Sequence, residues 1–573
     1  MFCPNCGKQL EEGTKFCPYC GLPLPQKPKA PEPVPQPAPA PQPVPAPQPQ
    51  VFWSAPQPSE PVKAAPERKA VLRDGAGKYI LKRLIFCAAA ILVSIGAALL
   101  FQSTFPAGAR AKNYGFPEAM QRLGNTLILI IVPLALSFAF SLLACIPKSN
   151  GGRNAFRIIS VFLRCLTPVA LAFFLIKLLA GPGLLPVMGG RGGVASWVLP
   201  VLTVSIPLTG FLMNAAAGNG HEGRFSASMG AMAAWAADRM PAIVTAAILS
   251  EMIFTVRGLG NLLVNAIMQL NMRFAVPALI LIGILIYLLK FLMDVIAALL
   301  SGGDPAEQVF AVRKKEDRSG NFLFIFGLAM AGLTLLVTLV LPFFATADLS
   351  RGNASAQLLP PGVRGYVFGT DQLGRDLFTV IAYASRNTIL LALSNTFVAA
   401  ALGIGFGVLS GIIRGGAREI FKGIRYVFGF GAPFALFLTL LLRGFSAQAP
   451  FFVFGLMSWG GIAERIGYGI KARRSARPEK TALVLPALEQ TVHVFTAQIF
   501  AATAASFLGL MIEPPVFQIL GRVLANGRAT VLAKSFASLL PAACLILLLL
   551  SLFLLHAGFA AKERYLKQEK QQK

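Results

Sequence analysis

Long apolar stretches separated by short polar breaks fill the chain from Leu84 to its C-terminal region. A helix that crosses the hydrocarbon core of a bilayer needs roughly 20 consecutive apolar residues. We count about twelve such stretches, and they predict an all-α polytopic membrane protein. The predicted spans are 84–101, 126–146, 158–180, 196–214, 241–255 and 274–299, then 322–345, 388–413, 426–443, 450–463, 485–510 and 534–558.

A basic segment at Arg313–Arg318 divides these spans into two sets of about six. We expect two transmembrane domains, 78–312 and 322–562, joined by a cytoplasmic linker at 313–321. A Pro/Ala-rich linker at 24–77 precedes them and a charged tail at 563–573 follows. The proline-rich linker cannot bury a core, so we interpret it as an extended tether, with display of a ligand for a partner as the alternative.

The composition agrees with a lipid environment, since 55% of the 573 residues are hydrophobic and only 13% are charged. That polar share is too small to cover the surface of a soluble protein of this size. The net charge of +27 reflects Lys and Arg in the short loops between apolar stretches, which encodes orientation rather than nucleic-acid binding.

Alternate loops carry the positive charge, which places them on the cytoplasmic side. No secretory signal precedes the first apolar stretch. We therefore expect a multi-pass protein of the bacterial cytoplasmic membrane with both termini in the cytoplasm. The basic residues that we assign to inner loops include Lys82, Arg83, Arg153, Arg157, Arg224, Arg239, Lys314, Arg418, Lys422, Arg473, Arg474 and Lys562.

Two CxxC pairs lie within the first 21 residues, at Cys3 and Cys6 and at Cys17 and Cys20. Four thiolates form a closed tetrahedral zinc site with no open position for catalysis, so the predicted cofactor is structural zinc in a ribbon at 1–23. The alternatives are a disulfide pair or a redox CxxC, which a cytosolic segment disfavours.

Several phrases resemble the permease subunits of bacterial dipeptide, oligopeptide and nickel ABC transporters. In the first half they are KYILKRLI, EMIFTVRGLGNLLVNAI (251–267) and FLMDVIAALLSGGDP (291–305). In the second half they are FGTDQLGRDLFTVIAYASRNTILLAL (368–393) and SFLGLMIEPPVFQILGRVLANGR (506–528). The phrases occur in the family's order, so the chain looks like a fusion of both permease subunits of an ABC importer with a type I permease fold.

The residues within these phrases are our candidates for a structural or translocation role. Gly369 and Gly374 would allow tight turns, and Asp371, Arg375 and Asp376 would pair and fix the outer loop. A Pro514–Pro515 pair would end a helix at the outer membrane face. The complete set is Gly258, Gly260, Asp294, Gly369, Thr370, Asp371, Gly374, Arg375, Asp376, Ser506, Gly509, Pro514 and Pro515.

The resemblance implies ABC ATPase subunits and an extracytoplasmic substrate-binding protein as partners. The chain has no GxxxxGKS/T sequence, so ATP hydrolysis must come from a separate protein. The family's EAA-type coupling loop corresponds to Asn214–Met240 and Glu464–Pro486, neither of which matches it cleanly. This difference weakens the prediction of coupling to an ATPase more than it weakens the prediction of the fold.

Ionisable residues inside spans are candidates for function because each is costly in lipid unless paired. Lys290 and Asp294 are spaced to neutralise each other on one helix, while Arg164 and Lys177 are interpreted as snorkelling side chains. Only three histidines and scattered cysteines disfavour a nickel path. No catalytic constellation is present, so we predict that the chain is not an enzyme.

The sequence thus favours the membrane permease of an ABC-type importer for peptides or similar small solutes. The main alternative is a degenerate permease fold that acts as a scaffold or regulator and recruits a cytoplasmic partner through the zinc ribbon. An ATP-independent channel has no specific support.

Overall fold

The computed structural model divides the chain into two units, Met1–Pro66 and Glu67–Lys573. It describes residues 68–104, 115–146, 150–190, 193–217, 225–269, 271–301, 320–345, 349, 352–413, 420–424, 426, 450–475, 481–511, 513, 517–532 and 536–572. The four predicted zinc ligands, the proline pair 514–515 and most of the predicted span 426–443 lie outside these residues.

The described part is helical, with one isolated bridge between Thr370 and Asp376. We call α1 to α8 the first half and α10 to α18 the second half. The first half contains α1 (Arg68–Thr104), α2 (Phe116–Ser141), α3 (Asn150–Cys165), α4 (Pro168–Leu175), α5 (Ala195–Ala217), α6 (Phe225–Ile253), α7 (Leu259–Met268) and α8 (Met272–Ser301). The second contains α10 (Gly320–Val340), α11 (Leu377–Ile412), α14 (Pro450–Leu456), α15 (Gly460–Ser475), α16 (Thr481–Phe507), α17 (Leu520–Gly527) and α18 (Leu539–Gln572).

The predicted all-α polytopic class is confirmed. Within the described ranges, 8 helices are long and apolar enough to cross a membrane, and 9 if the bent α3–α4 pair counts as one span. Three of the predicted spans are not among these. The span at 426–443 is largely outside the described residues, the span at 450–463 is divided between α14 and α15, and the span at 485–510 corresponds to α16, which does not meet the same criteria of length and apolarity.

Two predicted spans are broken helices. The span at 158–180 consists of α3 and α4, which meet at an angle of 87°. Pro168 at the start of α4 cannot continue the hydrogen bonding of α3, and the Thr167 hydroxyl accepts a hydrogen bond from the Ala170 amide at 3.3 Å. The predicted span at 450–463 is likewise divided between α14 and α15, so non-helical backbone lies within the bundle at both places.

Both candidate coupling segments belong largely to long helices. The Ala-rich text before the predicted span 241–255 is the beginning of α6, which starts at Phe225. In the second half, Glu464–Ser475 is the end of α15. Because these segments are polar, hydropathy did not predict that the helices extend well past the apolar stretches.

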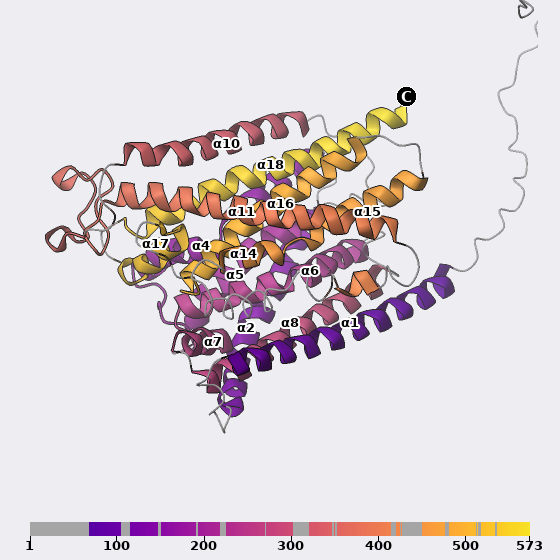
Figure 1. Cartoon of the computed structure of the whole chain (residues 1–573), viewed down its shortest axis with the longest axis horizontal. Helices are drawn as coiled ribbons and strands as arrows, with labels where there is room; N and C mark the ends of the chain where they lie inside the picture. The colour runs from indigo at the N-terminus through magenta and orange to yellow at the C-terminus, as the bar shows by residue number, and fades with distance from the viewer. Residues whose placement is uncertain are drawn as a thin grey trace, which may run out of the picture. The chain divides into compact units, whose positions relative to one another are not determined.

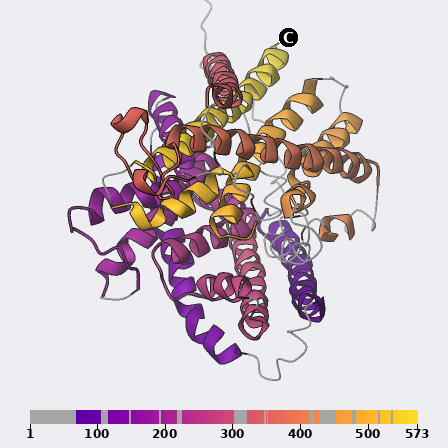
Figure 2. The same cartoon turned by 60° about the vertical axis from the view of Figure 1, so that its left-hand side comes forward.

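The two halves repeat one packing arrangement. α1 lies along α8 in the first half, and α10 lies along α18 in the second. α2 packs against α5, α6 and α7, and α11 packs against α15, α16 and α17. The short helices α7 and α17 lie at one end of the bundle, opposite the start of α1 and the end of α18 (Figures 1 and 2).

A single large core joins the halves. It contains buried side chains of both, including Phe173 of α4 and Phe507 of α16, whose ring centroids are 6.3 Å apart. α18 packs directly on α3 and α4. A cavity in this core is therefore bounded by helices of both halves.

Candidate functional site

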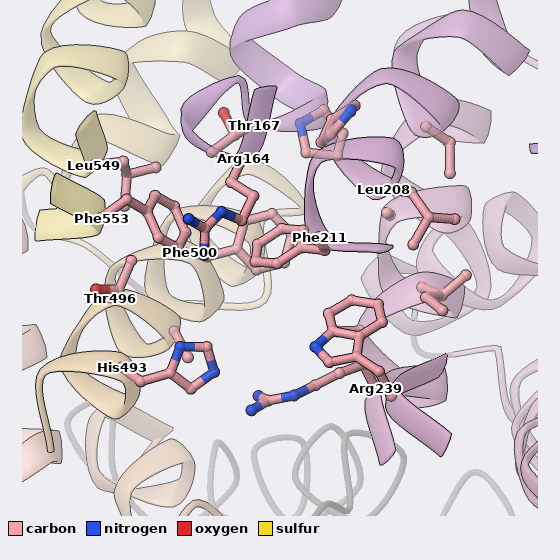
Figure 3. Close-up of a pocket in the computed structure, with 18 residues that line it drawn as sticks. Arg164, Thr167, Leu208, Phe211, Arg239, His493, Thr496, Phe500, Leu549 and Phe553 are labelled. Atoms are coloured by element: carbon pink, nitrogen blue, oxygen red, sulfur yellow. The ribbon is translucent and has the colours of Figure 1, made fainter. Parts of the chain in front are cut away.

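A cavity of about 140 Å³ lies between the halves. The first half contributes α3 to α6 to its wall, and the second contributes α16 and α18 (Figure 3). Its lining is Arg164, Thr167, Pro168, Val204, Pro207, Leu208, Phe211, Trp235, Arg239, Ala242, Ile243, Ala246, His493, Thr496, Ala497, Phe500, Leu549 and Phe553.

A second cavity of about 200 Å³ continues the first toward α14 and α15. Both cavities are lined by Arg239, Ala242, His493, Ala497 and Phe500, so they are contiguous. The second also reaches the α14–α15 break, where Met457 and Ser458 line it. The two broken helices of the bundle thus both border this space. Non-helical backbone at membrane depth is tolerated where it lines such a cavity or is buried in protein.

Arg164 is buried at the end of α3, with only 4% of its surface exposed. Its Nε donates to the Ser160 carbonyl at 3.1 Å, and its guanidinium carbon lies 5.1 Å from the ring centroid of Phe553 and 6.0 Å from that of Phe211. Figure 3 shows the guanidinium among these aromatic rings, directed into the cavity. The arginine is held by cation–π contacts and does not snorkel away from the core.

Arg239 enters the cavity from α6, where its neighbour Asp238 is held by Lys290 of α8. The Lys290 ammonium lies 3.3 Å from Asp238 Oδ1 and donates to the Ala237 carbonyl at 3.2 Å. That carbonyl is available because Pro241, four residues later, has no N–H to bond it. The proline therefore creates an acceptor for a lysine that is 1% exposed.

His493 of α16 faces Arg239 across the cavity (Figure 3). Its ring centroid is 5.2 Å from that of His556 on α18, and His556 Nε2 lies 3.6 Å from Glu489 Oε1. Glu489 is one turn before His493 on α16. An imidazole–imidazole–carboxylate cluster thus connects α16 and α18 beside the cavity.

The GTDQLGRD phrase forms a loop before α11, at the α17 end of the bundle. Gly369 and Gly374 have φ angles of 80° and 72°, as the predicted tight turns require. Asp371 pairs with Arg375 at 2.7 Å, whereas Asp376 accepts a hydrogen bond from the Thr379 amide at 3.0 Å and caps α11. Thr370 links the loop to the Leu359 amide at 2.8 Å.

Gly258, Gly260 and Ser506 occupy close-packed positions. A Cβ on Gly258 would overlap the Glu251 carboxylate, and one on Gly260 would overlap Ile248. Ser506 is fully buried at the end of α16, and Gly509, with a φ of 73°, follows it. None of the described motif residues belongs to the lining of either cavity.

Asp294 of α8 lies 3.7 Å from Arg83 Nε of α1. Lys290, which the sequence suggested as its partner, contacts Asp238 of α6. These ion pairs join α8 to α1 and α6.

Sequence reasoning missed Arg239 as a cavity residue because its position after a predicted span suggested an inner loop. The Ala-rich sequence of residues 225–240 could have indicated it. That composition favours a helix, and a helix there makes Arg239 part of a transmembrane segment. Arg164 was noted as an intramembrane ionisable residue, but nothing in the sequence brings it together with Arg239 and His493.

No group of three or more His, Cys, Asp or Glu side chains that could hold a metal ion occurs in the part of the chain that the structure describes. A family model described as a zinc-ribbon domain matches residues 2–24. The match contains the four cysteines of the two CxxC pairs and agrees with the ribbon predicted there.

Comparison with known proteins confirms the resemblance to peptide permeases. The chain is 29% identical over 238 residues to the probable D,D-dipeptide transport system permease protein DdpC of Escherichia coli, which covers 38% of this chain and 78% of the relative. It is 28% identical over 234 residues to the dipeptide transport system permease protein DppC of Bacillus subtilis, covering 36% and 71%.

A more distant relative is the oligopeptide transport system permease protein AmiD of Streptococcus pneumoniae, at 23% identity over 252 residues, covering 39% of this chain and 80% of the relative. Each match has about the length of one half of the transmembrane part. Together with the apolar helices, these relatives support a permease role in a multi-pass cytoplasmic membrane protein.

Proposed function

We propose that this chain is the transmembrane permease of an ABC-type importer for peptides or similar small solutes, with ATP hydrolysis by separate subunits and no catalysis in the chain itself. The observation that carries the proposal is the pair of contiguous cavities walled by helices of both halves. A solute path between two related halves is what alternating access requires, because rocking of one half against the other opens it to either side.

The long helices supply a route for coupling. α6 carries Arg239 in the cavity wall and runs back to Phe225, a distance of about 20 Å at 1.5 Å per residue. α15 extends from Gly461 in the second cavity to Ser475. An ATPase that engages these helix ends would move cavity-lining residues directly, without a separate coupling helix.

The partners follow from this mechanism: ABC ATPase subunits at the α6 and α15 ends, and a substrate-binding protein at the α7 and α17 end. Both termini are then cytoplasmic, and Cys3, Cys6, Cys17 and Cys20 hold a structural zinc ion. The described motif residues other than Asp294 serve the architecture of the outer end, whereas Asp294 pairs with Arg83 toward the start of α1. None of them lines a cavity.

The second candidate function is that of a scaffold or regulator. It is favoured because both coupling segments differ from the EAA-type motif of the family. In that case the zinc ribbon, and not the membrane part, would recruit the cytoplasmic partner.

Affinity purification from native membranes separates the two. We expect the full chain and a 67–573 variant, cut at the boundary between the two units, to recover an ABC ATPase with its ATPase activity. A full-length preparation without an ATPase would contradict the importer, and loss of all partners from the 67–573 variant alone would favour the scaffold.

A further inference from the structure

The cavity between the halves carries excess positive charge. Every ionisable residue that lines its first part is a base, namely Arg164, Arg239 and His493. A buried cation in a membrane protein is energetically costly unless a counter-charge is near. Such residues are therefore candidates for ligand contact.

The nearby carboxylates are engaged elsewhere. Asp238 is paired with Lys290 at 3.3 Å, and Glu489 lies 3.6 Å from His556. Among the described residues, neither Arg164 nor Arg239 has a carboxylate within salt-bridge distance. The described walls of the two cavities contain one carboxylate, that of Asp238 in the second cavity, against the two guanidiniums. That carboxylate is also paired with Lys290, so positive charge remains in excess.

The α3–α4 break adds to the positive potential. The N-terminus of α4 lies at the cavity, where Thr167 and Pro168 are part of the lining. Helix N-termini favour anions, and broken membrane helices direct such ends at anionic groups of transported solutes. The buried Arg164 lies three residues before this end.

The rest of the wall is apolar and aromatic. Phe211, Trp235, Phe500 and Phe553 surround the cations, and a cavity of about 150 Å³ accommodates a group of the size of benzene. The site therefore combines a place for a negative charge with a place for an apolar or aromatic side chain.

From this arrangement we infer that the cavity is a binding subsite for the carboxylate of an apolar solute, with Arg164 and Arg239 as its ligands and the aromatic wall as the receptor of the side chain. The inference rests on the proposed function, because it describes which solutes the permease accepts. It favours peptides with a free carboxyl terminus over neutral or cationic solutes.

The test uses two probes of nearly the same shape, the anion N-acetylphenylalanine and the neutral N-acetylphenylalaninamide. Binding to the purified full chain in phospholipid-free detergent is followed by tryptophan fluorescence, since Trp235 lines the cavity, and by calorimetry. We expect the acid to bind about tenfold more tightly than the amide or better, as charge-assisted hydrogen bonds imply.

Arg164→Gln and Arg239→Gln should each reduce the preference for the acid about tenfold. Arg164→Lys, which keeps the charge, should retain most of it and guards against misfolding of the Gln variant. Arg273→Gln removes an exposed arginine at the start of α8 that is not in the lining and should leave both affinities unchanged.

Equal affinity for the two probes, or binding of neither, would overturn the subsite. Competition of the acid by added phosphatidylglycerol at the same arginines would assign the cations to a lipid phosphate and overturn it as well. Binding of the probes needs no ATPase. A negative binding result would therefore contradict the subsite and not the importer, and a purification without an ATPase would contradict the importer and not the subsite.

Discussion

Thr126 of α2 and Thr388 of α11 make the same hydrogen bond in the two halves. The Thr126 hydroxyl accepts from the Leu259 amide at 2.7 Å, and the Thr388 hydroxyl accepts from the Leu520 amide at 3.0 Å. Each amide begins the short helix of its half, α7 or α17. Since the first amides of a helix lack partners within it, each hydroxyl satisfies a donor that would otherwise be unpaired in the core.

The residues just before Thr126 and Thr388 also make equivalent hydrogen bonds in the two halves. Asn125 donates to the Arg257 carbonyl at 3.0 Å and Asn387 donates to the Gln518 carbonyl at 3.1 Å. Each half therefore fastens its short helix to the equivalent long helix with an Asn-Thr pair. The two halves are structural repeats in this region, which supports the interpretation of the chain as two fused permease halves.

Replacement of Thr388 by Val should destabilise the second half by about 1–3 kcal/mol, because the fully buried Leu520 amide loses its acceptor. Thr126→Val should cost at least as much in the first half, because the Thr126 hydroxyl also donates to the buried Glu251 carboxylate. The measurement is denaturant unfolding in detergent. Thr334→Val is the control, since its hydroxyl bonds only its own helix, at the Met330 carbonyl; a cost as large as that of Thr388→Val would refute the role of the amide.

Substitution of Gly374 by Ala should destabilise the loop before α11 more than substitution of Gly362. Both glycines have positive φ angles, 72° and 82°, so both variants incur roughly 1–2 kcal/mol of backbone strain. At Gly374 the new Cβ also overlaps the Asn353 carbonyl, whereas nothing lies within 4 Å at Gly362. The overlap should add about 1–3 kcal/mol.

Hydrogen exchange of the loop amides measures this difference directly. Equal protection in Gly374→Ala and Gly362→Ala would show that close packing of the loop against residue 353 does not stabilise it.

Glu513, between α16 and α17, should make stability depend on pH. Burial raises the pKa of Glu513 above its ordinary value of 4.5, although the carboxylate accepts a hydrogen bond from the Ile519 amide at 3.0 Å. The folded state thus holds the proton more tightly than the unfolded state. The stability from protonation is present at low pH and is lost as pH rises through the folded pKa.

Glu513→Gln removes this titration, so the variant should gain stability relative to the unsubstituted protein as the pH rises above 4.5. Unfolding of both proteins across pH 4 to 8 (roughly the range where carboxyl groups and histidines titrate) tests the point. Parallel curves would contradict it.

The cysteines at the N-terminus should hold one zinc ion. Elemental analysis of the purified chain is expected to show zinc, and replacement of both Cys3 and Cys6 by Ser should abolish it, because two thiolates cannot complete a tetrahedral site. Cys544→Ser, which alters a cysteine of α18, is the matched control and should keep the metal. Zinc retained without Cys3 and Cys6 would exclude the predicted ligand set.

Most of the predicted spans coincide with long apolar helices of the described residues, because lipid imposes a long apolar stretch on every crossing helix. Helix ends were predicted poorly where a helix continues into polar sequence. Examples are α6, which begins at Phe225, and α15, which ends at Ser475. The breaks at Thr167–Pro168 and between α14 and α15 were also missed, since hydropathy does not register a bend within an apolar stretch.

The motif loop before α11 could be anticipated in part. Positive φ angles at Gly369 and Gly374 and the Asp371–Arg375 pair follow from the residue types and spacing, whereas the use of Asp376 as a helix cap depends on where α11 begins. The cavity could not be anticipated, because Arg164, Arg239 and His493 come from three distant segments. The Asn-Thr pairs at 125–126 and 387–388, each followed later by Leu-Gly, were a readable sign of the repeat.

The most direct test of the account is uptake by the protein reconstituted into liposomes with its co-purified ATPase subunits and a substrate-binding protein. We expect a labelled dipeptide to accumulate inside the vesicles with ATP and to fail to accumulate with a non-hydrolysable analogue. Absence of ATP-dependent uptake of any peptide by a complete, ATP-hydrolysing complex would contradict the assignment as a peptide permease.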